Sequence, residues 1–198
     1  ACMQAYKDSG CRIIVGWQVA DRPNPLNLPV YTTEEATTLM EQTVRTYDRR
    51  LDGRVRAWTM PFSAGFASDE LILAAKRLAD QYNTSMTLHH VVSPEAVDAS
   101  MKSYGKRPTE HLEDIGALGP NVVLAHALGI NEAELDAIVR TQTNLVMCPT
   151  AAIKGGSGMT RTGMLPEMLE QGVCVGLGTD AGNNSNLVET MRSMYLIS

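Results

Sequence analysis

The sequence predicts an α/β fold built from parallel βαβ units. Short apolar runs alternate with segments whose apolar residues recur at helical spacing, and this alternation favours crossover connections between parallel strands. In the run 175–184, a strand-like segment ends at Asp180 and a turn rich in Gly and Asn follows. The C-terminal end of a parallel strand is where α/β barrels place their chemistry, although an Asp there can also simply cap the next helix. A barrel and an open, doubly wound sheet both fit these patterns.

Six runs are predicted to be strands. Each is short, is apolar or alternates apolar and polar residues, and is bounded by turn or helix signals. The runs are residues 11–19, 54–60, 86–92, 122–128, 144–148 and 173–178.

Helical patterns separate the strands. Residues 33–51 open with Thr-Thr-Glu-Glu, which supplies a capping hydroxyl and an acidic first turn, and Ser68 begins a second helix. Further helices are expected around residues 131–141 and 164–171. The Gly-Gly-Ser-Gly run at 155–158 lacks the spacing of a dinucleotide-binding loop and is predicted to be an ordinary flexible loop.

Composition excludes several classes of function. A net charge of −5 without a basic patch argues against nucleic acid as a partner. No apolar run approaches the roughly 20 residues of a membrane span, and the first residues do not resemble a signal peptide. The four cysteines show no paired or framework spacing, so reduced thiols in a cytoplasmic protein are expected. At 198 residues the chain can form one or two domains.

Polar side chains capable of metal binding stand at strand ends. His89 and His90 close one strand, His126 closes the next, and Asp180 closes the last. In a parallel barrel these ends converge, and imidazoles with a carboxylate suit Zn²⁺ or a similar divalent ion. The alternative for any single histidine is a hydrogen-bonded core residue. Only one of His89 and His90 can face a barrel interior, because successive strand residues point to opposite faces. His111 lies among charges and is predicted to be a solvated helix residue.

Six short sequence motifs between Thr87 and Leu187 carry a family resemblance. They are Leu-His-His-Val-Val, Glu-His-Leu-Glu-Asp-Ile-Gly-Ala-Leu-Gly-Pro, Val-Leu-Ala-His-Ala, Cys-Pro-Thr, Gly-Ser-Gly-Met and Gly-Thr-Asp-Ala-Gly-Asn-Asn. In order and spacing they resemble the amidohydrolase superfamily, in the branch of the cytosine, guanine and S-adenosylhomocysteine deaminases and the triazine chlorohydrolases. The resemblance implies a (β/α)8 TIM-like barrel that holds one divalent metal, with Zn expected first and Fe or Co as alternatives.

The resemblance also assigns roles to individual residues. It makes His90 the metal ligand from the fifth strand and Asp180 the ligand from the eighth. His126 would polarise the substrate or hold the attacking water, and Asp180 would serve as general base and then general acid. The absence of a Lys at the end of the strand closing at Met60 fits a site with a single metal.

Departures from the family pattern shape the functional hypothesis. No His-x-His pair precedes the first predicted strand, so residues 1–198 are expected to cover about six βα units, strands 3 to 8, without the first strands or the flanking β domain. The deaminases carry a Glu three residues after the fifth-strand His. Here Ser93 stands three residues after His90, with Glu95 nearby beyond Pro94. Ser93, Glu95 and His126 are therefore the expected substrate-binding residues.

The leading hypothesis is a metal-dependent hydrolase of a small-molecule, non-peptide C–N bond (amide, carbamate or urea) or C–X bond. Loss of the Glu that would protonate a ring nitrogen weighs against deamination. Deamination of an aminopyrimidine, aminopurine or related heterocycle, with Glu95 or Ser93 recruited, is the enzymatic alternative. A catalytically incomplete barrel fragment that only binds is the other alternative. The intact enzyme is expected to be a homo-oligomer.

Overall fold

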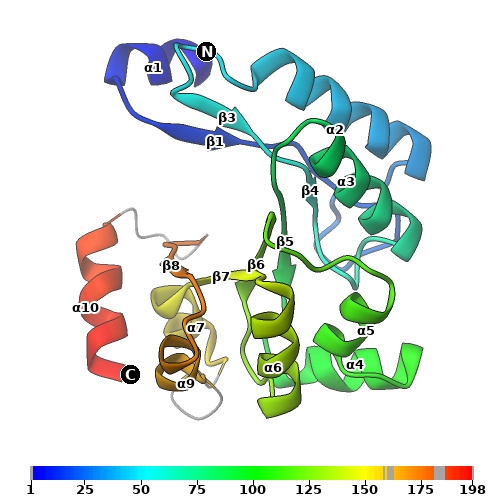
Figure 1. Ribbon diagram of the computed structural model, residues 1–198, viewed down its shortest axis with the longest axis vertical. Helices are drawn as coiled ribbons and strands as arrows, with labels where there is room; N and C mark the ends of the chain where they lie inside the picture. Colours follow the sequence, from blue (N-terminus) through cyan, green and yellow to red (C-terminus); the bar gives the residue numbers. More distant parts are fainter. Residues whose placement is uncertain (1, 158, 160–162, 181–185, 198) are drawn as a thin grey trace. The chain divides into compact units, whose positions relative to one another are not determined.

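The structure is a computed structural model that describes residues 2–157, 159, 163–180 and 186–197 (Figure 1). The chain forms two compact units, Ala1–Thr87 and Leu88–Ser198, and the boundary falls inside strand β5 (Met86–His90). None of the helices in the described ranges is long and apolar enough to cross a membrane.

The first unit contains two short parallel ladders and their helices. Strand β1 (Ile13–Val15) pairs with β3 (Val55–Ala57), and β2 (Gln18–Val19) pairs with β4 (Met60–Pro61). The helices of this unit are α1 (Cys2–Ser9), α2 (Thr33–Tyr47) and α3 (Asp69–Gln81).

Each of the first two predicted strands is broken into two pieces. Gly16 lies at the break between β1 and β2, where a Cβ atom would collide with the side chain of Met60. A hydrogen bond from Trp58 N to Val15 O (2.9 Å) extends the pairing into the break, and one from Phe62 N to Val19 O (2.8 Å) continues it past the ends of β2 and β4. The pieces therefore act as two parallel strands, as predicted.

The predicted helix starts in this unit are confirmed, whereas one helix end is not. Thr32 and Glu35 form a reciprocal capping box at the start of α2, and Ser68 caps α3 by accepting a hydrogen bond from Leu71 N. Helix α2 ends at Tyr47 rather than at residue 51. The carboxylate of Asp48, in an extended conformation, accepts a hydrogen bond from Ala57 N (2.9 Å) and redirects the chain.

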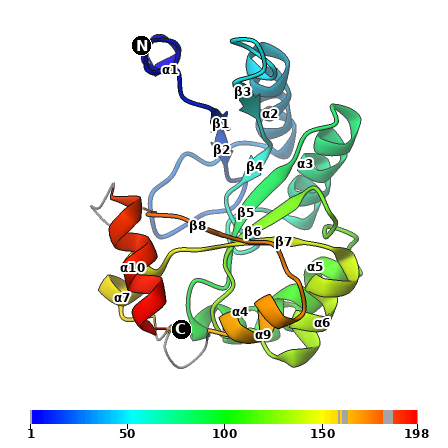
Figure 2. The ribbon, with the colours of Figure 1, turned by 60° about the vertical axis from the view of Figure 1, so that its left-hand side comes forward.

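The second unit holds a four-stranded sheet in the order β5-β6-β7-β8, as Figure 2 shows. Strand β6 spans Val122–His126, β7 spans Asn144–Met147 and β8 spans Val175–Leu177. The pairings β6–β7 and β7–β8 are parallel, which confirms the expected βαβ organisation.

Helices connect these strands, and one more follows β8. They are α4 (Pro94–Tyr104), α5 (Pro108–Asp114), α6 (Glu132–Thr141), α7 (Pro149–Gly155), α9 (Leu165–Glu170) and α10 (Leu187–Ile197). Alternate residues of β5 and β6 are buried. Together with apolar helix residues they form a core that includes Leu112, Leu124, Leu135, Ile138, Leu145, Met147 and Met168.

One prediction about the helices is wrong. His111 in α5 is not solvated: it is 7% exposed, and its ring stacks on Tyr104 with centroids 3.8 Å apart. The charged neighbours in the sequence suggested a surface position. The stacking partner comes from α4, and packing between α4 and α5 buries the ring.

Candidate functional site

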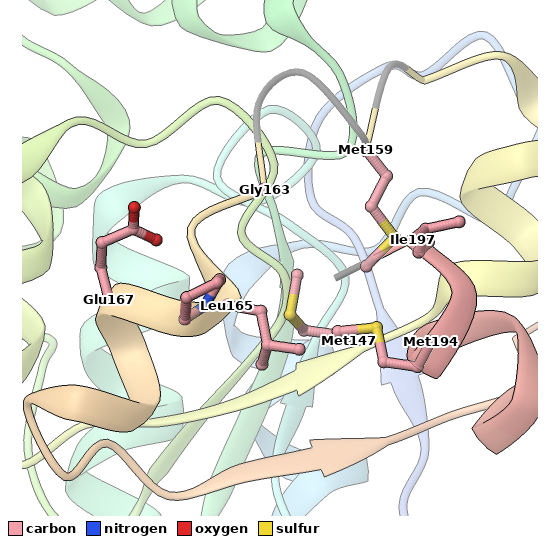
Figure 3. A pocket seen from close by; sticks show the side chains of 8 residues that line it. Met147, Met159, Gly163, Leu165, Glu167, Met194 and Ile197 are labelled. Carbon is pink, nitrogen blue, oxygen red and sulfur yellow. The ribbon is translucent and has the colours of Figure 1, made fainter.

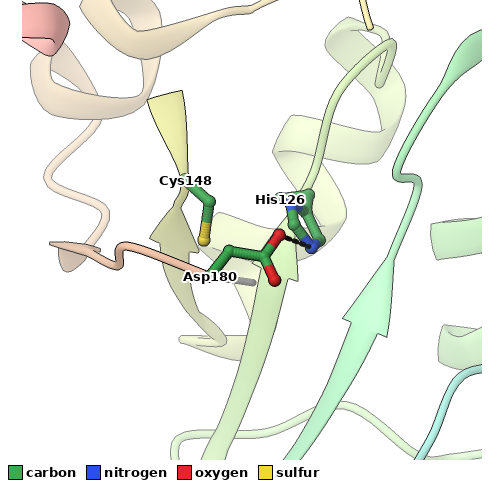
Figure 4. Close-up of side chains that lie close together, drawn as sticks. All are labelled: His126, Cys148 and Asp180. Carbon is green, nitrogen blue, oxygen red and sulfur yellow. Dashed lines mark ion pairs between the residues drawn. The ribbon is translucent and has the colours of Figure 1, made fainter. Parts of the chain in front are cut away.

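Three possible metal ligands meet at the ends of neighbouring strands in the second unit. His126 ends β6, Cys148 follows β7, and Asp180 follows β8 (Figure 4). The Nε2 atom of His126 lies 3.7 Å from Oδ2 of Asp180. The ligand atoms of all three side chains lie within 4.8 Å of one another. The structure thus brings together His126 and Asp180, two of the residues for which the sequence analysis expects chemical roles.

Unusual backbone conformations direct these side chains. His126, Ala127 and Asp180 have positive φ angles of 83°, 53° and 52°. Residues other than Gly adopt this region at a cost of about 1–3 kcal/mol each, and such strain is often found at functional sites. The extended strand ends at His126, so its ring does not have to follow the alternation of β6.

Gly178 leaves room for the thiol. A Cβ atom at this position would lie 3.0 Å from Sγ of Cys148 and 3.2 Å from a methyl carbon of Val146. Cys148 itself is only 6% exposed. The glycine directly after β8 therefore lets the thiol sit beside His126 and Asp180.

The two adjacent histidines of β5 are oriented opposite to expectation. The ring of His89 stacks on His126, with centroids 5.5 Å apart and planes 18° from parallel. The Nε2 atom of His90 instead lies 2.9 Å from Oγ1 of Thr109 in α5, and His90 is 3% exposed. Alternation along the strand holds, but it is His89 and not His90 that lies beside His126, and which of the two binds a metal stays a proposal. The expected orientation of His90 toward Asp180 is corrected to His89 beside His126.

This correction also moves the position expected to hold a proton donor. Three residues after His89 stands Val92, an apolar side chain that is 43% exposed. Ser93 and Glu95 lie at the start of α4, where Glu95 is exposed. A hydrogen bond from Ser93 holds the pKa of the Glu95 carboxyl below its usual range. These two polar side chains therefore interact with each other.

Burial controls the electrostatics of the site. Desolvation lowers the pKa of His126, and the nearby Asp180 carboxylate partly opposes this effect. Desolvation also raises the pKa of the Cys148 thiol to about 11, with a further contribution from Asp180. At neutral pH without a metal, the site therefore presents a neutral imidazole and a protonated thiol.

The donor set fits a borderline divalent ion. Imidazole nitrogen, carboxylate oxygen and thiolate sulfur are the ligands of zinc, with bonds of roughly 2.0–2.3 Å, which place two ligands of a tetrahedral ion roughly 3.3–3.8 Å apart. For a nitrogen and an oxygen ligand the separation is about 3.3–3.5 Å, so the 3.7 Å between Nε2 of His126 and Oδ2 of Asp180 is slightly longer, and a small side-chain shift would bring both onto one ion. Sequence reasoning had not given Cys148 a role, although a Cys directly after a buried strand could have signalled one.

A cavity of about 210 Å³ lies elsewhere in this unit, between α9, α10 and β7 (Figure 3). Glu167 lies at its edge. The rest of its lining is mostly apolar and includes Met147, Met159, Leu165, Pro166, Met194 and Ile197. Met147 is fully buried. Because successive residues of an extended chain point to opposite faces, its side chain lies on the face opposite to that of Cys148. The cavity belongs to the helix layer.

Comparison with known proteins identifies the family. The sequence model described as "Amidohydrolase family" matches residues 1–198. The chain belongs to the amidohydrolase family. Curated relatives of this amidohydrolase include the 5'-deoxyadenosine deaminase of Methanobrevibacter smithii, 28% identical over 98% of this chain and 43% of the relative. The 5-methylthioadenosine/S-adenosylhomocysteine deaminase 2 of Archaeoglobus fulgidus is 30% identical over 96% of this chain and 44% of the relative.

Solved structures show the same TIM-like amidohydrolase fold. Guanine deaminase of E. coli superposes with a TM-score of 0.87 and 25% identity, over 98% of this chain and 45% of that structure. A triazine hydrolase from Arthobacter aurescens also gives a TM-score of 0.87, at 20% identity, over 98% of this chain and 44% of that structure. The amidohydrolase chain thus spans less than half the length of the proteins it matches.

Proposed function

We propose that the protein containing this chain is a metal-dependent hydrolase that cleaves a C–N or C–X bond in a small molecule. The observation that carries the proposal is the convergence of His126 and Asp180 at 3.7 Å, at the ends of two parallel strands of an amidohydrolase fold. We further propose that the described strands correspond to strands 3 to 8 of a barrel, because the chain spans about 44% of its relatives.

The proposed metal is one divalent ion, Zn first and Fe or Co as alternatives. A neighbouring structure, an atrazine chlorohydrolase from Arthrobacter aurescens, is described as complexed with zinc. Asp180 and His126 would hold the ion. His89 replaces His90 as the proposed histidine ligand from β5, because its ring lies against His126. Cys148 offers an additional sulfur donor.

The side chains supply proton transfer and charge stabilisation. A bound divalent ion would make water ionise near neutral pH. Asp180, at the edge of this cluster, accepts the proton of the attacking water and delivers it to the leaving group. His126 would hold the ion beside Asp180, where its positive charge would stabilise the negative charge that develops on the oxygen at the attacked carbon. Both roles require the close approach of the two residues.

Deamination of a heterocycle is the second candidate function, favoured by the names of the curated relatives, which are deaminases of adenosine derivatives. Protonation of a ring nitrogen needs an acid near the metal. Val92 has no proton to supply, and Glu95 is exposed at the start of α4, where its carboxylate interacts with Ser93. We therefore rank hydrolysis of an exocyclic amide, urea or C–X bond first. A barrel piece that only binds its ligand is the third candidate.

Two further properties remain proposals. A homo-oligomeric state of the whole protein is proposed from the family resemblance. A cytoplasmic location is proposed from cysteine usage, with which the free thiols of Cys11, Cys148 and Cys174 agree.

The test uses the full-length protein loaded with zinc, with metal content measured in parallel. One group of substrates contains 5'-deoxyadenosine and guanine, assayed by ammonia release. The other contains small amides, ureas and a chlorotriazine. Turnover in the second group supports the leading proposal, and ammonia release confined to the first group replaces it with deamination. Stoichiometric zinc without turnover in either group contradicts both enzymatic candidates.

A further inference from the structure

A strained turn after β6 determines where His126 points. His126 and Ala127 both have left-handed backbone conformations, and Gly129 follows with φ of 77°. Two backbone hydrogen bonds tie one side of this turn to the end of β5: Ala127 N donates to His90 O and Leu128 N donates to Val91 O, both at 2.9 Å. Such a conformation persists only where its surroundings over-determine it.

A buried ion pair holds the other side of the turn. Arg107 donates through Nη2 to the carbonyl oxygen of Gly129 (2.6 Å) and through Nε to Oε2 of Glu134 (2.7 Å). Glu134 is fully buried, whereas the Arg107 side chain is 25% exposed. One guanidinium therefore connects the turn to the first residues of α6.

The Glu134 carboxylate accepts hydrogen bonds from three donors. Besides Arg107 it accepts hydrogen bonds from Asn131 N (3.2 Å), at the end of the turn, and from Thr109 N (3.0 Å) in α5. The Thr109 hydroxyl in turn meets His90 at 2.9 Å. A single buried charge thus links the turn, the start of α5 and the end of β5.

Stability alone is a weak explanation for this arrangement. A buried ion pair costs desolvation that its Coulomb attraction often fails to repay, and apolar residues of similar volume are frequently as stabilising. Apolar residues, however, cannot form hydrogen bonds, and so they cannot orient both Gly129 O and Asn131 N. The arrangement fits a requirement for geometry.

We propose that Arg107 and Glu134 are positioning residues that clamp residues 126–131, so that His126 is held facing Asp180. This inference rests on the proposed metal-binding role of His126 and Asp180. Arg107 and Glu134 act through the turn, and neither is assigned a contact with metal or substrate.

The chain provides a matched control pair. Arg140 and Glu113 join the same two helices, α6 and α5, with Nη2–Oε1 and Nη2–Oε2 distances of 2.7 and 2.9 Å. This pair lies in the last turns of the helices, and the Arg140 side chain is 60% exposed. Glu134→Gln and Glu113→Gln therefore make the same chemical change in the same helix pair, at a buried clamp and at an exposed bridge.

The experiment measures zinc affinity by calorimetry in the full-length protein, at a temperature where circular dichroism shows each variant folded. Glu134→Gln is expected to weaken zinc binding by about 10–100-fold, the scale seen when groups that orient a ligand are removed. Glu113→Gln is expected to bind zinc as the parent does. Arg107→Lys keeps the charge but not the two-pronged donor geometry, so it is expected to weaken zinc binding as well.

The outcomes separate the two proposals. If Glu134→Gln and Arg107→Lys lower the melting temperature but bind zinc as tightly as the parent, the pair is only structural and the positioning role is overturned. If Glu134→Gln does not fold, Arg107→Lys decides alone by the same criterion. If the parent protein binds no zinc, the metal site itself fails and the inference falls with it.

Discussion

His126 and Asp180 lie 3.7 Å apart, although β7 separates the strands that carry them. His126 is the last residue of β6 and Asp180 stands three residues after β8, and each has a positive φ angle. The two left-handed residues turn an imidazole and a carboxylate toward each other across the end of β7. Cys148 lies at that same end, so the third donor comes from the intervening strand.

Asp180→Asn should abolish most of the activity of the full-length enzyme. The amide cannot accept and return the water proton, and loss of the negative charge weakens metal binding. A drop in kcat of about 10²–10⁴ is expected for a lost general acid–base group, with more where metal is also lost. Ser93→Ala serves as the control and should cost far less. Full activity of metal-replete Asp180→Asn would contradict the mechanism, and a collapse of Ser93→Ala with metal retained would favour deamination.

His89→Ala and His90→Ala should impair different properties of the protein. His89→Ala should lower zinc affinity, since the ring lies against His126. His90→Ala should lower the free energy of unfolding by about 1–3 kcal/mol, the cost of leaving the buried Thr109 hydroxyl unsatisfied. Zinc titration and denaturant unfolding on both variants check this. Normal zinc binding by His89→Ala, together with loss of zinc in His90→Ala, would restore the assignment made from the sequence.

The pH dependence of stability should report the buried His90. Desolvation lowers its pKa from 6.5 to about 4, with Glu134 opposing and His126 reinforcing the shift. Between these two pH values the unfolded chain binds more protons than the folded one. Stability contributed by neutral His90 is therefore present above pH 6.5 and is lost as pH falls toward 4.

The measurement is denaturant unfolding of the metal-free protein across that range. One such group changes the free energy of unfolding by at most about 1.4 kcal/mol per pH unit. His90→Asn removes the titrating ring and should flatten the curve, leaving the smaller effect of His126, whose pKa is also lowered. An unchanged slope in His90→Asn would show that His90 does not titrate as its burial requires.

Cys148 should react slowly with thiol reagents. Its pKa rises from 9.0 to about 11, so at pH 8 the thiolate, which is the nucleophile, is about 100-fold scarcer than for an unshifted thiol. Burial slows the reaction further. Alkylation of the metal-free protein followed by peptide mapping should label the exposed Cys11 and Cys174 first. Equal labelling of all three would show that Cys148 is open to solvent.

The sequence alone determined the order of elements and several of their boundaries. The Thr32–Glu35 capping box and Ser68 placed the starts of α2 and α3, because a capping hydroxyl is a local signal that needs no tertiary partner. Short apolar runs bounded by turn and helix signals placed β5 and β6, because such runs are a local signal for buried strands. Where a long-range contact ended an element, as Asp48 does for α2, the sequence prediction overran.

The residues at the strand ends could also be identified from the sequence, but the directions in which their side chains point could not. His126 and Asp180 could be named because an imidazole or carboxylate closing an apolar strand is a visible exception to its pattern. Whether His89 or His90 turns toward them depends on which face of β5 meets helix α5, and the hydrogen bond to Thr109 decides it. The left-handed turn at His126 is likewise tied to Arg107, which reaches the carbonyl oxygen of Gly129 across 22 residues of sequence. Local patterns determine which residues can do chemistry, whereas contacts between distant segments decide which of them face one another.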